Sequence, residues 1–85
     1  MEFTSSKEKY VIENGLIKTY DKKGLAQVIV IKSISWIWNT ARDNSLFNAI
    51  KRLEIHTNSK DNPLPIYVDS SEQAEQVLEE IYKYL

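Results

Sequence analysis

The sequence contains no cysteine and a single histidine, His56. Without cysteine the chain cannot form disulfide bonds, and one histidine is too few for a usual zinc site. With only two glycines and two prolines, the chain also offers little loop from which an enzyme could build a cleft. We therefore expect no metal and no cofactor, and a stability that comes from packing, helix caps and turns.

Long apolar runs are missing as well. The longest, Val28 to Ile31, has four residues, whereas a membrane-spanning helix needs about 20. The first eight residues contain no apolar segment typical of a signal peptide, so we expect a cytoplasmic protein. A chain of 85 residues fits one domain. We expect a flexible N-terminal arm at residues 1–8 and a single domain at residues 9–85.

Catalytic motifs are absent too. No P-loop, G-x-S-x-G, H-E-x-x-H or EF-hand pattern occurs. Glu54 and His56 are two residues apart on a predicted strand, about 6.5–7 Å. At this spacing they could act as a general base and the carboxylate that orients it. No nucleophile accompanies them at a recognisable spacing, and a histidine on the polar face of a strand accounts for the pattern. The sequence therefore predicts that the protein is not an enzyme.

The charges are unevenly distributed along a chain whose net charge is only −1. Residues 1–60 carry a net charge of +4, and residues 61–85 carry −5. The isoelectric point of about 5.8 lies well below the values above about 9 that are typical of nucleic-acid-binding domains. Because the acidic C-terminal segment would repel phosphate, neither nucleic acid nor a membrane is the expected partner.

Turn signals divide the first part of the chain into strands. Asn14-Gly15 separates residues 9–13 from residues 16–20, and Asn-Gly tolerates the positive φ angles of a type I′ hairpin. A second turn is predicted at residues 21–24, where a glycine ends the turn.

Three further segments have strand patterns. Residues 25–39 are rich in β-branched and aromatic side chains but apolar on both faces, so we expect a bend near Lys32 and two strand pieces. Residues 52–57 alternate cleanly between polar and apolar side chains. Residues 64–68 form a further strand, and because Pro63 and Pro65 cannot donate to a ladder, we expect either an edge strand or a strand whose first half is unpaired.

The clearest element is a helix at residues 71–85. Two pairs have the spacing of a capping box at its start, Ser70 with Gln73 or Asp69 with Glu72. An apolar stripe follows at helical spacing: Ala74, Val77, Leu78, Ile81, Tyr82 and Leu85. A short helical turn is also expected within residues 46–50. The predicted fold class is α+β, an antiparallel sheet of about five strands packed by one C-terminal helix.

Trp36 and Trp38 are the most suggestive candidates for binding a partner. They share one strand parity, and tryptophan is enriched at the centres of protein interfaces. If the strand carrying Arg52 and His56 lies alongside, these four residues form an aromatic patch with a cationic rim. We expect this patch to contact a protein partner or a second copy of the chain.

Lys18, Lys22 and Lys23 are the alternative candidates. They cluster around the second predicted turn and could contact phosphate groups of a nucleic acid or an anionic lipid. Three lysines beside an aspartate are better explained as a soluble hairpin tip.

The order of these segments resembles the short bacterial pleckstrin-homology-like (PH-like) domains. The resemblance lies in the apolar spacing of residues 10–17 and 30–37, then in residues 50–57 and 66–68 ahead of a helix. It spans about residues 10–85. The resemblance implies a PH-like fold and a scaffold that binds proteins or peptides, sometimes lipids, without catalysis.

Two classes of function remain open at this point. The first is a non-catalytic protein-interaction module, a class that includes small standalone regulators and inhibitors of larger complexes. The second is a binder of nucleic acid or anionic lipid that uses the basic sheet and the lysine turn. The charge distribution favours the first.

Overall fold

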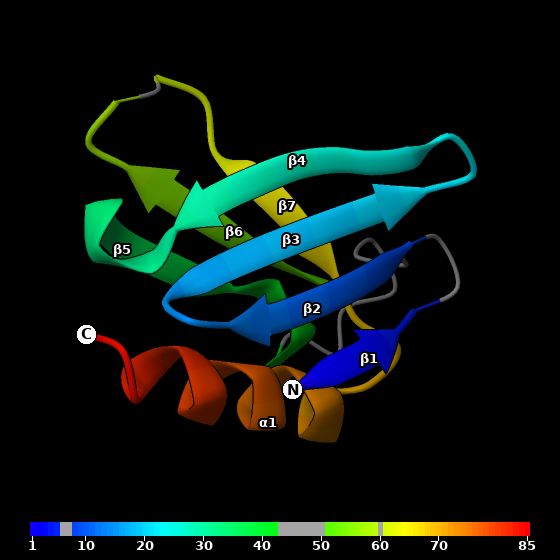
Figure 1. The fold of residues 1–85 in the computed structure, drawn as a ribbon. Coiled ribbons are helices and arrows are strands. Elements are labelled where there is room, and N and C mark those ends of the chain that lie inside the picture. The colour runs from blue at the N-terminus through cyan, green and yellow to red at the C-terminus, as the bar shows by residue number, and fades with distance from the viewer. Residues whose placement is uncertain (6–7, 43–50, 60) are drawn as a thin grey trace.

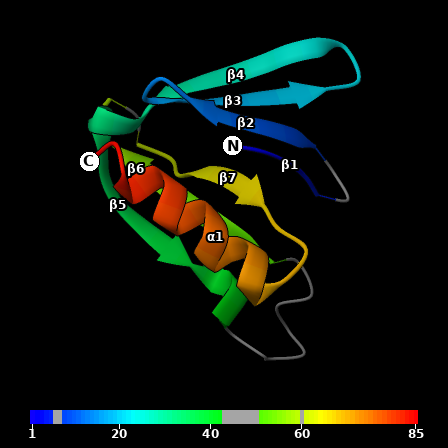
Figure 2. The same cartoon turned by 60° about the horizontal axis from the view of Figure 1, so that its bottom comes forward.

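The computed structural model describes residues 1–5, 8–42, 51–59 and 61–85, which form two antiparallel sheets and one helix. The first sheet has the order β1-β2-β3-β4: β1 (Glu2–Thr4), β2 (Lys9–Glu13), β3 (Leu16–Asp21) and β4 (Gly24–Val30). The second has the order β5-β6-β7: β5 (Ile34–Asn39), β6 (Arg52–Thr57) and β7 (Leu64–Tyr67). Helix α1 (Ser71–Tyr82) lies below the crossed sheets in Figure 1 and alongside the second sheet in Figure 2.

The prediction of one sheet with about five strands is wrong, although the α+β class is confirmed. The sheets separate where β4 ends, because residues 31–33 form a 3₁₀ turn, η1 (Ile31–Ser33), instead of continuing the strand. This turn is the bend expected near Lys32, and the two strand pieces belong to different sheets. Ile31 is fully buried and Ile34 packs against the core, so the turn lets both side chains point inward.

Within the expected N-terminal arm, residues 2–4 form strand β1, which pairs with β2. Phe3 is buried and stacks on Tyr10 of β2, with 4.9 Å between ring centroids. Phe3 therefore packs against a side chain of the neighbouring strand. The sequence around Phe3 does not predict this contact. The helical turn expected within residues 46–50 lies outside the described residues.

The Asn14-Gly15 hairpin is confirmed. Asn14 and Gly15 have φ angles of 53° and 76°, and Glu13 pairs with Leu16 directly across the turn. The second turn is also present: the Asp21 carboxylate accepts the Lys23 N–H at 2.8 Å.

Helix α1 begins where the capping pattern predicts. The Gln73 N–H donates to the Ser70 hydroxyl at 3.1 Å, while the Gln73 side chain accepts the Asp69 N–H at 2.7 Å. The helix ends at Tyr82, three residues before the predicted end, and Leu85 is exposed. None of the described helical segments is long and apolar enough to cross a membrane.

The core lies between the two sheets and under the helix. Its fully buried large side chains come from both sheets, the 3₁₀ turn and the helix: Tyr10, Ile12, Ile17, Ile31, Leu53, Ile55, Ile66, Val77 and Ile81. A hydrogen bond connects the two sheets across this core: the Tyr10 hydroxyl accepts the Tyr67 N–H at 2.9 Å. Burial raises the pKa of Tyr10 to about 12, against the opposing effect of this hydrogen bond.

Candidate functional site

The outer face of the second sheet carries the predicted tryptophan pair. Trp36 and Trp38 leave 54% and 56% of their surface exposed, far more than core residues do. Trp36 lies opposite His56, and the two rings stack with 3.7 Å between centroids and 7° between planes. The structure thus brings Trp36, Trp38 and His56 together on one exposed face, as the strand parity indicates.

Arg52 also lies on β6, but its charge is engaged. Its guanidinium donates two hydrogen bonds to one carboxylate oxygen of Glu54, from Nη2 at 2.9 Å and from Nε at 3.1 Å. The predicted cationic rim is therefore an ion pair. Because Glu54 stands opposite Trp38, this pair borders the aromatic patch and adds little net charge to it.

The pairing of His56 with Glu54 as base and orienter does not form. Glu54 is bound to Arg52, and the buried Nε2 atom of His56 has no hydrogen-bond partner among the described residues. The imidazole instead packs flat on Trp36. Nowhere in the described ranges do three His, Asp or Glu side chains gather closely enough to hold a metal ion.

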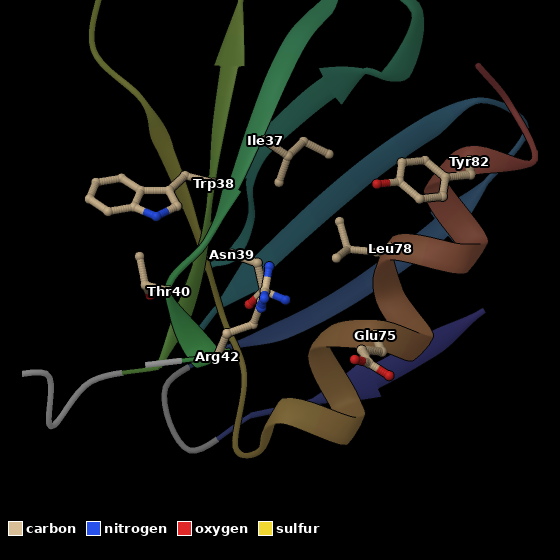
Figure 3. A pocket seen from close by; sticks show the side chains of 8 residues that line it. All are labelled: Ile37, Trp38, Asn39, Thr40, Arg42, Glu75, Leu78 and Tyr82. Carbon is tan, nitrogen blue, oxygen red and sulfur yellow. The ribbon is translucent and has the colours of Figure 1, made fainter. Parts of the chain in front are cut away.

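A groove runs between β5 and helix α1 and has a volume of about 780 Å³. In Figure 3, Ile37 points from β5 toward the helix, and Leu78 and Tyr82 point back from α1. Trp38 lies on the opposite side of β5 and forms the outer rim. The remaining lining residues are Asn39, Thr40, Arg42 and Glu75.

The main chain of β6 shows which way β5 directs its own hydrogen-bonding groups. The N–H and C=O of Arg52 both bond to the Thr40 hydroxyl, at 3.2 and 2.7 Å. The C=O of His56 accepts the Ser35 hydroxyl at 3.0 Å. Even-numbered residues of β6 therefore turn their main-chain groups toward β5.

Main-chain direction alternates along an antiparallel strand, so the opposite residues of β5 follow the same rule. Trp36 and Trp38, opposite His56 and Glu54, direct their N–H and C=O groups to β6. Ile37 then directs its N–H and C=O away from β6, at the outer edge of β5, while its side chain faces the groove beside helix α1. In the described part of the chain no strand pairs with this outer edge of β5.

The lysine cluster is not brought together. Lys18 lies in the middle of β3, where its ammonium is 3.2 Å from the Glu13 carboxylate. Lys22 and Lys23 are exposed at the turn, about 13 Å further along the strand direction. The structure thus separates one of the three candidate phosphate ligands and pairs it with a carboxylate.

Sequence reasoning missed the helical wall of the groove. Tyr82 belongs to the apolar stripe of the helix, yet 60% of its surface is exposed. Leu78 is half-buried and faces the groove. An apolar stripe wider than the core can cover is the sequence signal that could have indicated this wall.

Comparison with known proteins identifies no match. No protein-family model matches the chain, no curated protein is similar to it, and no solved structure matches the fold. The case for a function therefore depends on the site itself.

Proposed function

We propose that this protein is a non-catalytic protein-interaction module that binds an extended segment of a partner protein along β5. A module with one such site suits a small standalone regulator or inhibitor of a larger complex. One observation carries the proposal: the outer edge of β5 opens into a groove of about 780 Å³ walled by helix α1.

Strand addition explains why an edge and a groove belong together. A peptide added to a sheet edge gains affinity from main-chain hydrogen bonds, and pockets for alternate side chains give it specificity. The sequence of β5, ISWIWN, contains neither a charged residue nor a proline, the two common devices that keep a second strand away from an edge. The N–H and C=O of Ile37 supply the hydrogen bonds.

The same geometry defines the chemistry of the bound segment. Residues opposite one another in a sheet point to the same face, so the peptide residue opposite Ile37 enters the groove between Leu78 and Tyr82. Aliphatic or aromatic side chains suit that position. The peptide residues on either side point outward beside Trp36 and Trp38, where aromatic or cationic side chains can stack.

The architecture supports a PH-like assignment as part of this proposal. Two antiparallel sheets followed by a C-terminal helix form the element order that the resemblance to short bacterial PH-like domains implies. That resemblance also implies protein or peptide binding without catalysis.

A displayed library of random 12-residue peptides, selected on the immobilised protein, tests the proposal. We expect the selected peptides to share an apolar residue that enters the groove, with aromatic or cationic residues on either side of it that point outward. Binding should slow the amide exchange of Ile37. The amide of Trp36, which already faces β6, serves as the internal control. Methylating the main-chain nitrogen of the peptide residue opposite Ile37 should weaken binding at least tenfold, because it removes one inter-strand hydrogen bond.

Trp38→Ala and Leu78→Ala should each weaken the same peptides at least tenfold, whereas Lys22→Ala should leave them unchanged. Selected peptides that protect neither Ile37 nor any other groove residue would contradict the proposal. Salt-sensitive binding of single-stranded DNA or anionic vesicles, lost in Lys22→Ala and Lys23→Ala, would support the alternative function in its place.

A further inference from the structure

The stack of His56 on Trp36 covers only one face of the indole ring. The ring centroids are 3.7 Å apart and the planes differ by 7°, so the imidazole covers the indole face that is turned toward β6. The other face of Trp36 is turned toward the outer edge of β5, and 54% of the surface of this residue is exposed. A side chain opposite Trp36, on a strand added at this edge, would therefore form the third layer of the stack.

Both an aromatic ring and a planar cation fit this free indole face. Tryptophan is the best aromatic acceptor for a cation placed over its ring, and arginine is the more common partner. Shape alone does not choose between a neutral ring and a guanidinium. The charges that border the groove make the choice.

Helix α1, which forms one wall of the groove, is acidic. Its sequence SEQAEQVLEEIY contains four glutamates and no basic residue. Glu80 is paired with Lys83 at 3.1 Å. Glu72, Glu75 and Glu79 are exposed, and their spacing of i, i+3 and i+7 places them on one side of the helix. Glu75 lines the groove itself, and within the described ranges none of these three carboxylates forms an ion pair.

One cation stands across the groove from these glutamates. Arg42 ends the 3₁₀ turn η2 (Thr40–Arg42) and lies with Glu75 at the lower end of the groove in Figure 3. The lysines that precede β5 and β6, Lys32 and Lys51, do not line the groove. Three negative charges on the helical side therefore oppose the single positive charge of Arg42, and this balance favours a basic occupant over a neutral or acidic one.

We propose that the segment bound along β5 is basic, with an arginine opposite Trp36 and a lysine or arginine opposite Asn39. This inference rests on the proposed function and names the chemistry of the partner at that same site. The arginine stacks on the free face of Trp36. Asn39 shares its strand face with Ile37, so the second basic side chain enters the groove at the end where Glu75 lies. Its aliphatic stem covers apolar surface while its charge reaches the carboxylate.

The composition of the peptides selected from the random library tests this inference first. We expect lysine and arginine to be enriched next to the apolar residue and two positions from it, relative to the unselected library. Fluorescence anisotropy of one labelled selected peptide then gives its dissociation constant. Replacing the arginine next to the apolar residue by citrulline, which is planar but neutral, should weaken binding about threefold. Raising the salt from about 50 to about 500 mM should weaken the parent peptide at least threefold.

Three protein variants locate the charge effect. Glu75→Gln should weaken the parent peptide about two- to fivefold, as expected for an exposed ion pair. Arg42→Gln should strengthen it, because it removes a like charge from the same end of the groove. Glu80→Gln is the matched control, since it makes the same change of charge on the same helix but lies about 140° around the helix from Glu75 and outside the groove lining. It should leave the dissociation constant within about 1.5-fold.

The outcomes separate this inference from the function on which it rests. Neutral or acidic peptides that protect Ile37 from exchange would overturn the inference and leave the proposed function standing. Equal effects of Glu75→Gln and Glu80→Gln would also overturn the inference, and so would a loss of affinity in Arg42→Gln. Peptides that protect neither Ile37 nor another groove residue would overturn both.

Discussion

The two edges of the second sheet differ although they belong to the same three strands. At β7, Pro65 has no N–H to offer, and the Tyr67 N–H bonds to the Tyr10 hydroxyl from the other sheet. Among the described residues β5 has neither device, and the main chain of Ile37 faces away from β6 at the border of the groove. One edge is thus closed by the protein itself and the other is available, which indicates where a partner strand can be added without competing with the fold.

The largest difference in the free energy of unfolding is expected between variants of a core residue in β7, Ile66, and of the groove residue in β5, Ile37. Ile66 is fully buried, so Ile66→Ala should lower the free energy of unfolding by about 2–5 kcal/mol. Ile37 is only half-buried, so Ile37→Ala should cost less than about 2 kcal/mol and instead lose affinity for selected peptides. Urea denaturation measures both, and equal costs would show that Ile37 belongs to the core.

The second prediction concerns the tyrosine that closes β7. Because burial raises the pKa of Tyr10 from 10 to about 12, the folded state holds the phenol proton more tightly than the unfolded state does. The contribution of the protonated Tyr10 to the stability of the folded state is fully present below pH 10 and is lost as the pH rises toward 12. The loss should amount to roughly 2–3 kcal/mol. Denaturation between pH 9 and pH 12 measures it, and Tyr10→Phe should lack this component of the pH dependence.

At neutral pH, Tyr10→Phe removes the acceptor of the Tyr67 N–H while it keeps the ring that stacks on Phe3. We expect a loss of about 1–3 kcal/mol, the usual cost of depriving a buried donor of its partner. The specific signature is faster amide exchange at Tyr67, because this N–H loses its acceptor. An unchanged exchange rate there would show that the hydroxyl does not close this edge.

The smallest effect on stability is expected for the exposed tryptophans. Trp36→Ala removes the stack on His56 at the surface and should cost less than about 1 kcal/mol. Trp38→Ala should cost a similar amount. Thermal melts separate this outcome from a core role, in which either variant would lose several kcal/mol. Only Trp38 also lines the groove, so Trp38→Ala should weaken selected peptides more than Trp36→Ala does.

Much of the local structure follows from the sequence because its signals are local. The Asn14-Gly15 turn, the bend near Lys32 and the start of α1 each depend on residues within a few positions of one another. The division into two sheets does not. Whether a chain that turns at residues 31–33 rejoins the same sheet or begins another depends on long-range packing, which no local pattern encodes.

The candidate site shows the same limit. Strand parity was enough to place Trp36 and Trp38 on one face, but the position of His56 beside them depends on the pairing of β5 with β6, which the sequence left as a condition. The engagement of Arg52 by Glu54 was within reach, since the two residues share a face two positions apart. The groove was not, because it needs the distance between β5 and a helix more than 30 residues later in the chain.

The turn at Asn14-Gly15 has a consequence for the order of folding. Its Gly15 carbonyl accepts the Ile31 N–H in the link between the two sheets. A Cβ added at Gly15 would lie 3.9 Å from the ring of Tyr84, so the same turn also borders the C-terminal end. A hairpin of this kind closes in about 1–10 μs, long before distant strands can meet. We expect it to act as the nucleus on which the second sheet and the helix later dock. Gly15→Ala, strained at a φ of 76°, should then slow folding more than it speeds unfolding, and a chevron with only the unfolding limb changed would exclude this order.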